Sequence, residues 1–400
     1  MEHYDVRQIA EDESRAAHTV LLRSLHQPPD SDELWEYSSA SFSADRTFSA
    51  FADGNPVGTA SSFGTDLAVP GGKQVQTAAV DGVGVRADHR RRGVFSRLMR
   101  AQLADCRDRG DVLAILHASE TTIYGRVGYG IATHGVDLRI NTSKASLRAD
   151  APAGGRVQLL EAGEAVERLP KVYAQIAPYR AGMITRPAVW WPGRADRLLR
   201  HERDHQAAVH IGPDGADGFV LYQTIVSDDH TATLRVRDLH GANTAARVGL
   251  WRFLLGMDLV REVEAAGRPA DEPVGAVLVD PRACKVTGME DQLWLRLIDV
   301  PAALHARTYG SAEPVVIEVA DQLLPENAGR YLITPDGAQR TEQQASIRMD
   351  VDALAMLYLG EWSPSTLADI GRISTDDPAE VAALDGLLGA SHRPWCGTGF

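Results

Sequence analysis

Apolar residues in the first 150 positions follow two spacings, one typical of strands and one typical of helices. Alternating or short continuous apolar runs bounded by turn residues predict strands, at residues 47–63 (a hairpin around DGNP), 75–86 and 112–119. Apolar side chains that recur at i, i+3 and i+4 predict helices, at residues 18–25, 32–39 and 94–110. This part of the chain is therefore expected to form an α/β domain.

The next part of the chain repeats this order of elements. A Gly/Ala/Pro-rich linker precedes a helix, a meander of strands, a second helix and a strand, at residues 165–176, 205–241, 244–257 and 273–280. The repeated order indicates a diverged internal duplication. Strands and then helices follow, at residues 315–321, 329–337, 345–350, 351–360 and 364–371. We expect mixed α/β sheets in three domains, at residues 1–150, 151–295 and 296–400.

The composition is that of a soluble globular protein. Of the 400 residues, 44% are hydrophobic and 24% charged, and no apolar run reaches the roughly 18 residues of a membrane span. The three cysteines fit neither a disulfide framework nor a metal site, and the acidic N-terminus does not resemble a secretory leader. We therefore expect a cytoplasmic protein without a metal. The net charge of −13 argues against nucleic acid as the main partner.

One segment is basic in spite of this acidic balance. Residues 86–109 contain eight arginines and three aspartates, and the run HRRRGVF joins a predicted strand to a predicted helix. The first N–H groups of a helix have no partner within it and lie at the positive end of its dipole, so they can bind an anion. Gly93 would let a pyrophosphate approach the backbone. A solvated basic loop that only precedes the helix is the alternative.

These features together resemble the GNAT superfamily of acyl-coenzyme A N-acyltransferases. RRRGVF is similar to its pyrophosphate loop, R/Q-x-x-G-x-G/A, although Phe95 stands where glycine or alanine is usual. Nearly the whole chain resembles the Eis (enhanced intracellular survival) acetyltransferases, in VRADHRRRGVFSRLMRAQL, LHASETTIYGRVGYGIAT, LWLRLIDVPAALHARTYG and DALAMLYLGEWSPSTLADIGRI. The resemblance implies a catalytic GNAT domain, a degenerate GNAT-like domain without the arginine–glycine loop, and a domain like sterol carrier proteins.

The resemblance also implies acetyl-coenzyme A as co-substrate. Its pyrophosphate would lie against the loop and the start of the helix, at Arg91, Arg92, Gly93, Val94, Phe95 and Ser96. The pantetheine arm would pair with the main chain of Val83, Gly84 and Val85, and the Val85 N–H would polarise the thioester carbonyl. Further contacts are expected at Ser119 and Glu120. The side chains of Val83 and Val85 are expected in the strand core as well.

The leaving thiolate needs a proton donor. A tyrosine hydroxyl is suited to this, because its pKa near 10 keeps it protonated at neutral pH. Tyr124 and Tyr129 lie in the motif IYGRVGYG, and each could instead be only a core aromatic residue. The family places its general acid at the first tyrosine of this motif, which makes Tyr124 the candidate.

The attacking amine needs a base. In the family the base is the α-carboxylate of the last residue, here Phe400, whereas a chain end is otherwise usually frayed. An α-carboxyl is about seven pKa units more acidic than an alkylammonium, which corresponds to about 9.5 kcal/mol. Burial must therefore raise the carboxyl pKa, the amine must enter neutral, or the proton must leave late, from the tetrahedral intermediate. His117 is interpreted as a core residue.

Two functions of different classes are compatible with the sequence. The first is an acetyl-coenzyme A-dependent N-acetyltransferase that acts on aminoglycosides, with several amines modified in turn, or on lysine side chains. By the resemblance it would form a homohexamer, and Trp35 would line the acceptor pocket, unless it only packs on the next domain. The second is a non-catalytic scaffold that binds acyl-coenzyme A or lipid. Tyr124 together with a terminal Phe400 favours the enzyme.

Overall fold

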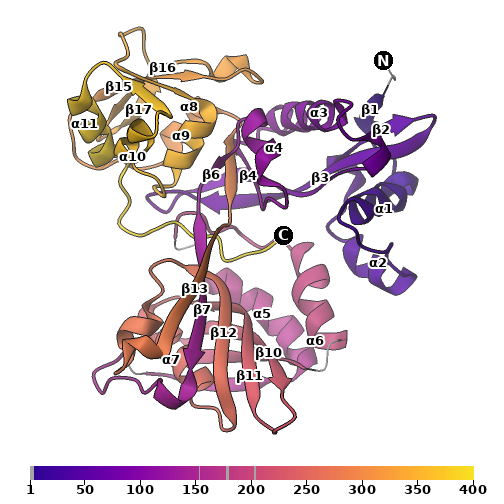
Figure 1. Cartoon of the computed structure of the whole chain (residues 1–400), viewed down its shortest axis with the longest axis vertical. Helices are drawn as coiled ribbons and strands as arrows, with labels where there is room; N and C mark the ends of the chain where they lie inside the picture. Colours follow the sequence, from indigo (N-terminus) through magenta and orange to yellow (C-terminus); the bar gives the residue numbers. More distant parts are fainter. Residues whose placement is uncertain (1–3, 153, 177–179, 202–203) are drawn as a thin grey trace.

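The computed structural model describes residues 4–152, 154–176, 180–201 and 204–400. The chain folds around three sheets, each with helices packed against it (Figure 1). Parallel and antiparallel strand pairs occur in all three sheets, as expected for mixed α/β sheets. No helix of the described residues is long and apolar enough to cross a bilayer.

The first sheet has the strand order β1-β2-β3-β4-β5-β14-β6. Its strands are β1 (Asp5–Gln8), β2 (Thr47–Ala52), β3 (Asn55–Ala68), β4 (Gln74–Val85), β5 (Leu113–Leu116), β6 (Gly130–Ile131) and β14 (Trp294–Leu297). Its helices are α1 (Ser14–Ser24), α2 (Asp32–Ser38), α3 (Val94–Asp108) and α4 (Thr121–Tyr124). Helix α1 packs on one face, where a Cβ on Gly84 would overlap the Ser24 side chain, and α3 packs on the other, where a Cβ on Gly58 would lie 2.8 Å from Val94. Glycine at these positions permits the close approach.

The second sheet has the order β13-β7-β12-β11-β10-β9-β8. Its strands are β7 (His134–Asn141), β8 (Arg156–Leu160), β9 (His205–Gly212), β10 (Gly215–Val226), β11 (Ala232–Gly241), β12 (Val260–Pro269) and β13 (Cys284–Asp291). Its helices are α5 (Ala162–Ile176), α6 (Arg197–His201) and α7 (Thr244–Leu255). Along β10, Phe219 and Leu221 face the cluster that contains α5, while Val220 and Tyr222 face the cluster that contains α7. The sheet is thus covered on both sides.

The first two sheets exchange strands. Strand β7 comes from within residues 1–150, yet it lies between β13 and β12 of the second sheet. Strand β14, at the expected boundary near residue 295, pairs with β5 and β6 of the first sheet. Residue ranges alone therefore do not separate the two sheets, and the boundaries 1–150, 151–295 and 296–400 stay a prediction.

The third sheet has the order β17-β16-β15-β18-β19. Its strands are β15 (Val315–Ala320), β16 (Gly329–Thr334), β17 (Gly337–Arg340), β18 (Ile347–Asp350) and β19 (Ile373–Thr375). Its helices are α8 (Val300–Ala306), α9 (Val351–Tyr358), α10 (Pro364–Asp369) and α11 (Pro378–Leu388). The expected strands and helices of this part are present as β15, β16, β18, α9 and α10, whereas α8, α11, β17 and β19 are additional.

One predicted strand is wrong. Residues 273–280 were expected as the strand after α7, but they contain a short 3₁₀ helix, Pro273–Val277, and the strand is β12 instead. Strand β12 has charged residues between its apolar ones and therefore lacks the apolar run that predicts a buried strand.

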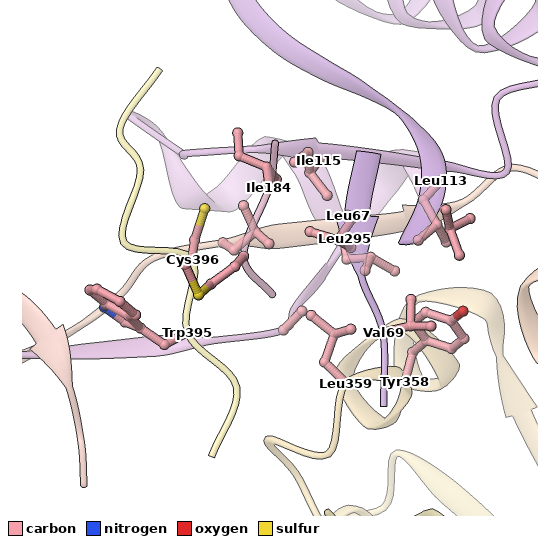
Figure 2. Packing of buried hydrophobic residues seen from close by; sticks show 14 of the residues in the cluster. Leu67, Val69, Leu113, Ile115, Ile184, Leu295, Tyr358, Leu359, Trp395 and Cys396 are labelled. Atoms are coloured by element: carbon pink, nitrogen blue, oxygen red, sulfur yellow. The ribbon is translucent and has the colours of Figure 1, made fainter. Parts of the chain in front are cut away.

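The largest apolar cluster lies where all three sheets meet. It contains Leu221 of the second sheet and Ile317 of the third. Figure 2 shows Leu67, Ile115 and Leu295 of the first sheet between Cys396 near the chain end and Tyr358 of α9. Burial of these side chains from distant parts of the sequence holds the three domains together.

Candidate active site

Strands β4 and β5 separate where they reach the middle of the molecule. They pair in parallel only from Thr77 to Ala79, opposite Leu113 to Ile115. A bulge at Asp81 follows, and β4 then continues to Val85 with β3 as its only partner among the described strands. A bulge bends a strand and increases its twist, which accounts for the separation.

The separated part of β4 turns main-chain groups toward the β5 side. The Arg86 N–H donates to the Val57 carbonyl of β3 (2.9 Å). Because backbone groups alternate in direction along a strand, the N–H groups of Val83 and Val85 face away from β3. An extended ligand could pair with them as a further strand would.

The arginine–glycine loop leads from this strand end into α3. Arg91 and Gly93 have left-handed φ angles of 61° and 81°, and no side chain caps the N-terminus of α3. The unpaired N–H groups of the first helical turn are therefore available to an anion. Of the residues predicted to hold the pyrophosphate, Arg91, Arg92, Gly93 and Ser96 are exposed, whereas Val94 is buried.

The residues after β5 lie across from this loop. Ser119 and Glu120 are exposed, and the Glu120 carboxylate accepts from the Thr122 hydroxyl (2.8 Å) at the start of α4. This bond is the main cause that lowers the pKa of Glu120, and the nearby charge of Arg90 adds to it. Arg90 and Glu120 are therefore near enough for their charges to interact.

Tyr124 is buried at the end of α4. Its ring packs against Phe95 (5.8 Å between ring centroids), Tyr129 (5.9 Å) and Trp294 (6.5 Å). Burial raises the pKa of Tyr124 to about 12, so its hydroxyl remains protonated at neutral pH. Phe95, which departs from the usual loop pattern, is therefore one of the residues that hold the Tyr124 ring in place.

The chain end, residues 395–400, hereafter the tail, lies between the first and second sheets (Figure 1). The Phe400 ring packs edge-on against His117 (4.7 Å between centroids) and Phe63 (5.7 Å). The Thr398 carbonyl lies 3.0 Å from His117 Nε2, and Trp190 Nε1 donates to the Gly399 carbonyl (2.9 Å). The tail is thus bound along its length rather than frayed.

His117 belongs to this site. It follows directly on β5, and its pKa is lowered, mainly because it is buried, although the Thr398 and Gln292 carbonyls oppose the shift. His117 is thus a site residue as well as a core residue, as the sequence predicted; the signal for a site was a polar residue at the end of an otherwise apolar strand.

Phe400 and Tyr124 approach from opposite faces of the first sheet. Ala114 and Leu116 of β5 face the cluster of Tyr124 and α3, while Leu113 and Ile115 face the cluster on which Phe400 packs. The gap between β4 and β5 lies between these two faces. A group held in the gap could receive a proton from one face and lose one to the other.

Trp35 lies farther from these residues. Its half-buried ring in α2 packs against His18 (5.2 Å between centroids), and in the described part of the chain it has no ring contact with Tyr124 or Phe400. Helix α2 contacts residues Pro192–Asp196 of the second domain, where a Cβ on Gly193 would lie 3.5 Å from the Tyr37 carbonyl. Its place in the acceptor pocket stays a prediction.

No group of three or more His, Cys, Asp or Glu side chains among the described residues could hold a metal ion.

Comparisons with protein-family models agree with the three sheets. Residues 5–132 and residues 182–297 each match an acetyltransferase (GNAT) domain, and residues 300–397 match a sterol carrier protein domain. GNAT acetyltransferases use acetyl-coenzyme A. The expected succession of two GNAT domains and a sterol carrier-like domain is confirmed.

Similar proteins cover almost the whole chain. An uncharacterised N-acetyltransferase of Streptomyces avermitilis is 35% identical over 98% of this chain and 97% of its own length. The N-acetyltransferase Eis of Mycobacterium tuberculosis is 36% identical over 84% of each chain. The crystal structure of Eis1 from Mycobacterium abscessus superposes with a TM-score of 0.89, at 35% identity, over 99% of this chain and 100% of that one. The chain therefore belongs to the Eis family of N-acetyltransferases within the GNAT superfamily.

Proposed function

We propose that the protein transfers the acetyl group of acetyl-coenzyme A to a primary amine, with Tyr124 as general acid and the Phe400 carboxylate as general base. The observation that carries this proposal is the bound tail: Phe400 packs on His117, at the end of β5, on the sheet face opposite Tyr124. Family membership favours the enzyme over a non-catalytic scaffold.

The proposed site for the co-substrate follows the strand, the loop and the helix. The pyrophosphate would bind the exposed N-terminus of α3 with Arg91, Arg92, Gly93, Val94, Phe95 and Ser96. The main chain of Val83, Gly84 and Val85 would pair with the pantetheine arm, and Ser119 and Glu120 would lie across from it. The Val85 N–H, which faces away from β3, would donate to the thioester oxygen.

In the proposed reaction, the amine nitrogen attacks the thioester carbonyl carbon, so that a C–N bond forms and the C–S bond breaks. The Phe400 carboxylate takes the proton that the nitrogen loses, and the Tyr124 hydroxyl gives its proton to the departing sulfur. Transfer of the carboxyl proton back to the tyrosinate through solvent restores both groups. The products are an acetamide and free coenzyme A.

The acceptor class is proposed from charge and from the family resemblance. The chain carries a net charge of −13, which favours the approach of a polycation. We propose aminoglycosides, acetylated at several amines in turn as in antibiotic resistance, as the first acceptor class and lysine side chains as the second. The pocket would include Trp35, next to which α2 meets the second domain.

We further propose a cytoplasmic homohexamer. The three cysteines are free thiols, which suits a reducing compartment. Val286 and Met289 are exposed on β13, an edge strand of the second sheet, where a second copy could cover them. Light scattering of the purified protein tests the subunit number.

A thiol-release assay tests the proposed function. The full chain is incubated with acetyl-coenzyme A and a panel of amines that includes kanamycin-like aminoglycosides and a lysine peptide. We expect free thiol in proportion to the acetylated amine found by mass analysis. Absence of thiol release with every amine would overturn the proposal and favour the scaffold.

A further inference from the structure

The second domain supplies many of the hydrogen bonds that hold the tail. Trp395 Nε1 donates to the Gly267 carbonyl of β12 (2.8 Å). His240 Nε2 lies 3.0 Å from an Asp238 oxygen and 3.2 Å from the Gly397 carbonyl. Arg186 Nη2 lies 3.1 Å from the same nitrogen, so His240 contacts Asp238, Arg186 and the tail at one point.

Arg186 is the centre of this binding site. Its buried guanidinium forms an ion pair with Asp238 (2.5 Å) and donates to the Thr398 hydroxyl (3.0 Å) and the Gly397 carbonyl (3.0 Å). The guanidinium also lies between two aromatic rings, 4.1 Å from the Tyr173 centroid and 4.2 Å from the Trp190 centroid. A planar group held on its faces and its edges has little freedom to move.

The backbone that carries Arg186 is fixed to the first sheet. The Thr185 N–H donates to the Asp66 carbonyl (2.9 Å), and the Met183 carbonyl accepts from the Ala68 N–H (2.8 Å). The segment before Arg186 therefore pairs with the C-terminal end of β3. Arg186 is thus bonded through its backbone neighbours to the first domain, through Asp238 to the second, and through Thr398 to the tail.

The second sheet has a position, beside β11, that is equivalent to the gap between β4 and β5 in the first sheet. Arg268 and the tail occupy this position. In β11 a bulge at Arg237 follows the last parallel pair with β12, as the bulge at Asp81 does in β4. Leu239 lies two residues after the bulge at Arg237, and Val83 lies two residues after the bulge at Asp81, so the two positions correspond. The Leu239 carbonyl accepts from Arg268 (3.0 Å), and the Trp395 ring stacks on that guanidinium (4.8 Å).

The helix that follows β11 is also closed to an anion. The Asn243 side chain accepts from the Ala246 N–H (2.8 Å) at the N-terminus of α7, whereas α3 has no such cap. The second domain therefore lacks the free helix start and the open strand gap of the first.

We propose that the second GNAT domain serves as the binding site for the chain's own end, and that Arg186 is a positioning residue that holds the Phe400 carboxylate at the first domain's site. The inference rests on the proposed function for its catalytic consequence. Its structural consequence, an anchored Phe400, can be measured independently.

The test combines protease protection with kinetics on the full chain. Carboxypeptidase A should release Phe400 slowly from the wild type and at least about tenfold faster from Arg186→Ala, because the tail loses two hydrogen bonds to the guanidinium. In the thiol-release assay, kcat should fall about 100-fold, as expected for a displaced catalytic group, while KM for acetyl-coenzyme A stays within about twofold. Arg186→Lys should restore part of kcat.

Arg235→Ala is the matched control, because Arg235 of β11, like Arg186, pairs with a carboxylate, Glu264, but on the surface. It should leave both readouts unchanged. Thr398→Val changes only the tail and removes the hydroxyl that accepts a hydrogen bond from Arg186 Nε. It should give the same changes to a smaller degree, and it tests the proposal even if Arg186→Ala fails to fold.

Unchanged protection of Phe400 in both Arg186→Ala and Thr398→Val would overturn the proposal, and so would an unchanged kcat. If the wild type releases no thiol with any amine, while Phe400 is protected in the wild type and exposed in Arg186→Ala, the anchoring stands and the proposed function fails.

Discussion

Burial changes the acidity of Tyr124, the proposed general acid. Its raised pKa, about 12, keeps the hydroxyl protonated throughout the neutral range but also makes it a weaker acid than free tyrosine. The departing sulfur must therefore be a strong base when it takes the proton, as a thiolate shielded from water would be.

Removal of this hydroxyl should slow the reaction and leave binding intact. Tyr124→Phe keeps the ring that packs on Phe95 and Trp294. We expect kcat to fall by about 10²–10⁴, the usual contribution of general acid catalysis, with KM for acetyl-coenzyme A nearly unchanged. Steady-state thiol release measures both. A kcat close to that of the wild type would exclude Tyr124 as the acid.

Two glycines of the tail form a matched pair. Gly397 has a φ of 65°, and a Cβ there would overlap the Trp395 ring, whereas a Cβ on Gly399 would have nothing within 4 Å. Gly397→Ala should therefore displace the tail and lower kcat at least about tenfold, because a misplaced catalytic group is costly. Gly399→Ala should retain most of the activity. Equal kcat values for the two variants would mean that the path of the tail is unimportant.

Histidine burial predicts a dependence of stability on pH. Burial lowers the pKa of His18, His117 and His240. An unfolded chain binds protons at these positions near pH 6.5, before the folded chain does, so the free energy of unfolding should decrease as the pH falls below about 6.5. Burial raises the pKa of Asp81, so the folded chain binds this proton before the unfolded chain does as the pH falls toward the usual pKa of aspartate. Asp81 therefore opposes the loss of stability, at a lower pH than the histidines act.

The melting temperature at pH 7.5 and 5.5 measures this dependence. It should be lower at pH 5.5, and His117→Gln should reduce the difference because one depressed pKa is removed. A difference that is the same in His117→Gln and in the wild type would show that His117 does not contribute.

Strand β14 depends on a buried ion pair for its place between the first and third domains. Arg296 is fully buried, pairs with both oxygens of Asp321 (2.8 and 2.7 Å) and donates to the Val127 carbonyl (3.0 Å). Loss of one charge leaves the other buried and unpaired, which costs about 3–5 kcal/mol. Asp321→Asn should lower the melting temperature by several degrees.

Glu326→Gln is the control for this change. Glu326 pairs with Arg107 of α3 (2.9 Å) and so also joins the first and third domains, but on the surface. Surface pairs contribute little, so the melting temperature of Glu326→Gln should stay near that of the wild type. Equal losses in the two variants would contradict a special role for the buried pair.

The elements were predictable to different degrees. The amphipathic pattern of residues 94–110 and the apolar run at 112–119 predicted α3 and β5, because burial decides both patterns. The exchange of β7 and β14 between the first two sheets was not predictable, since both strands satisfy the same local pattern whichever sheet they join. Strand β12, with its alternating charges, was missed for the reason given above.

The candidate site was predictable only in its local parts. The arginine–glycine loop and Tyr124 each stand in a recognisable run of sequence, and resemblance to a family suggested Phe400. Arg186 and Trp190, which contact the tail more than 200 positions away, have no such run around them. Contacts between remote segments depend on the packing of the three domains, which local patterns do not contain.

The three domains have distinct tasks in this account. The first presents the strand gap and the loop, the second binds the tail, and the third delivers it through residues 389–394 to the site (Figure 1). Catalysis would therefore require the assembled chain, since each domain alone lacks either the acid or the proposed base.

Extension of the chain by a few residues after Phe400 tests this account most directly, because it keeps the aromatic ring but converts the α-carboxylate into an uncharged amide. If the carboxylate is the base, acetyl-coenzyme A should still bind to the extended protein while thiol release falls at least about 100-fold, and Phe400→Ala, which keeps the carboxylate, should lose less. Full turnover by the extended protein would mean that the base lies elsewhere.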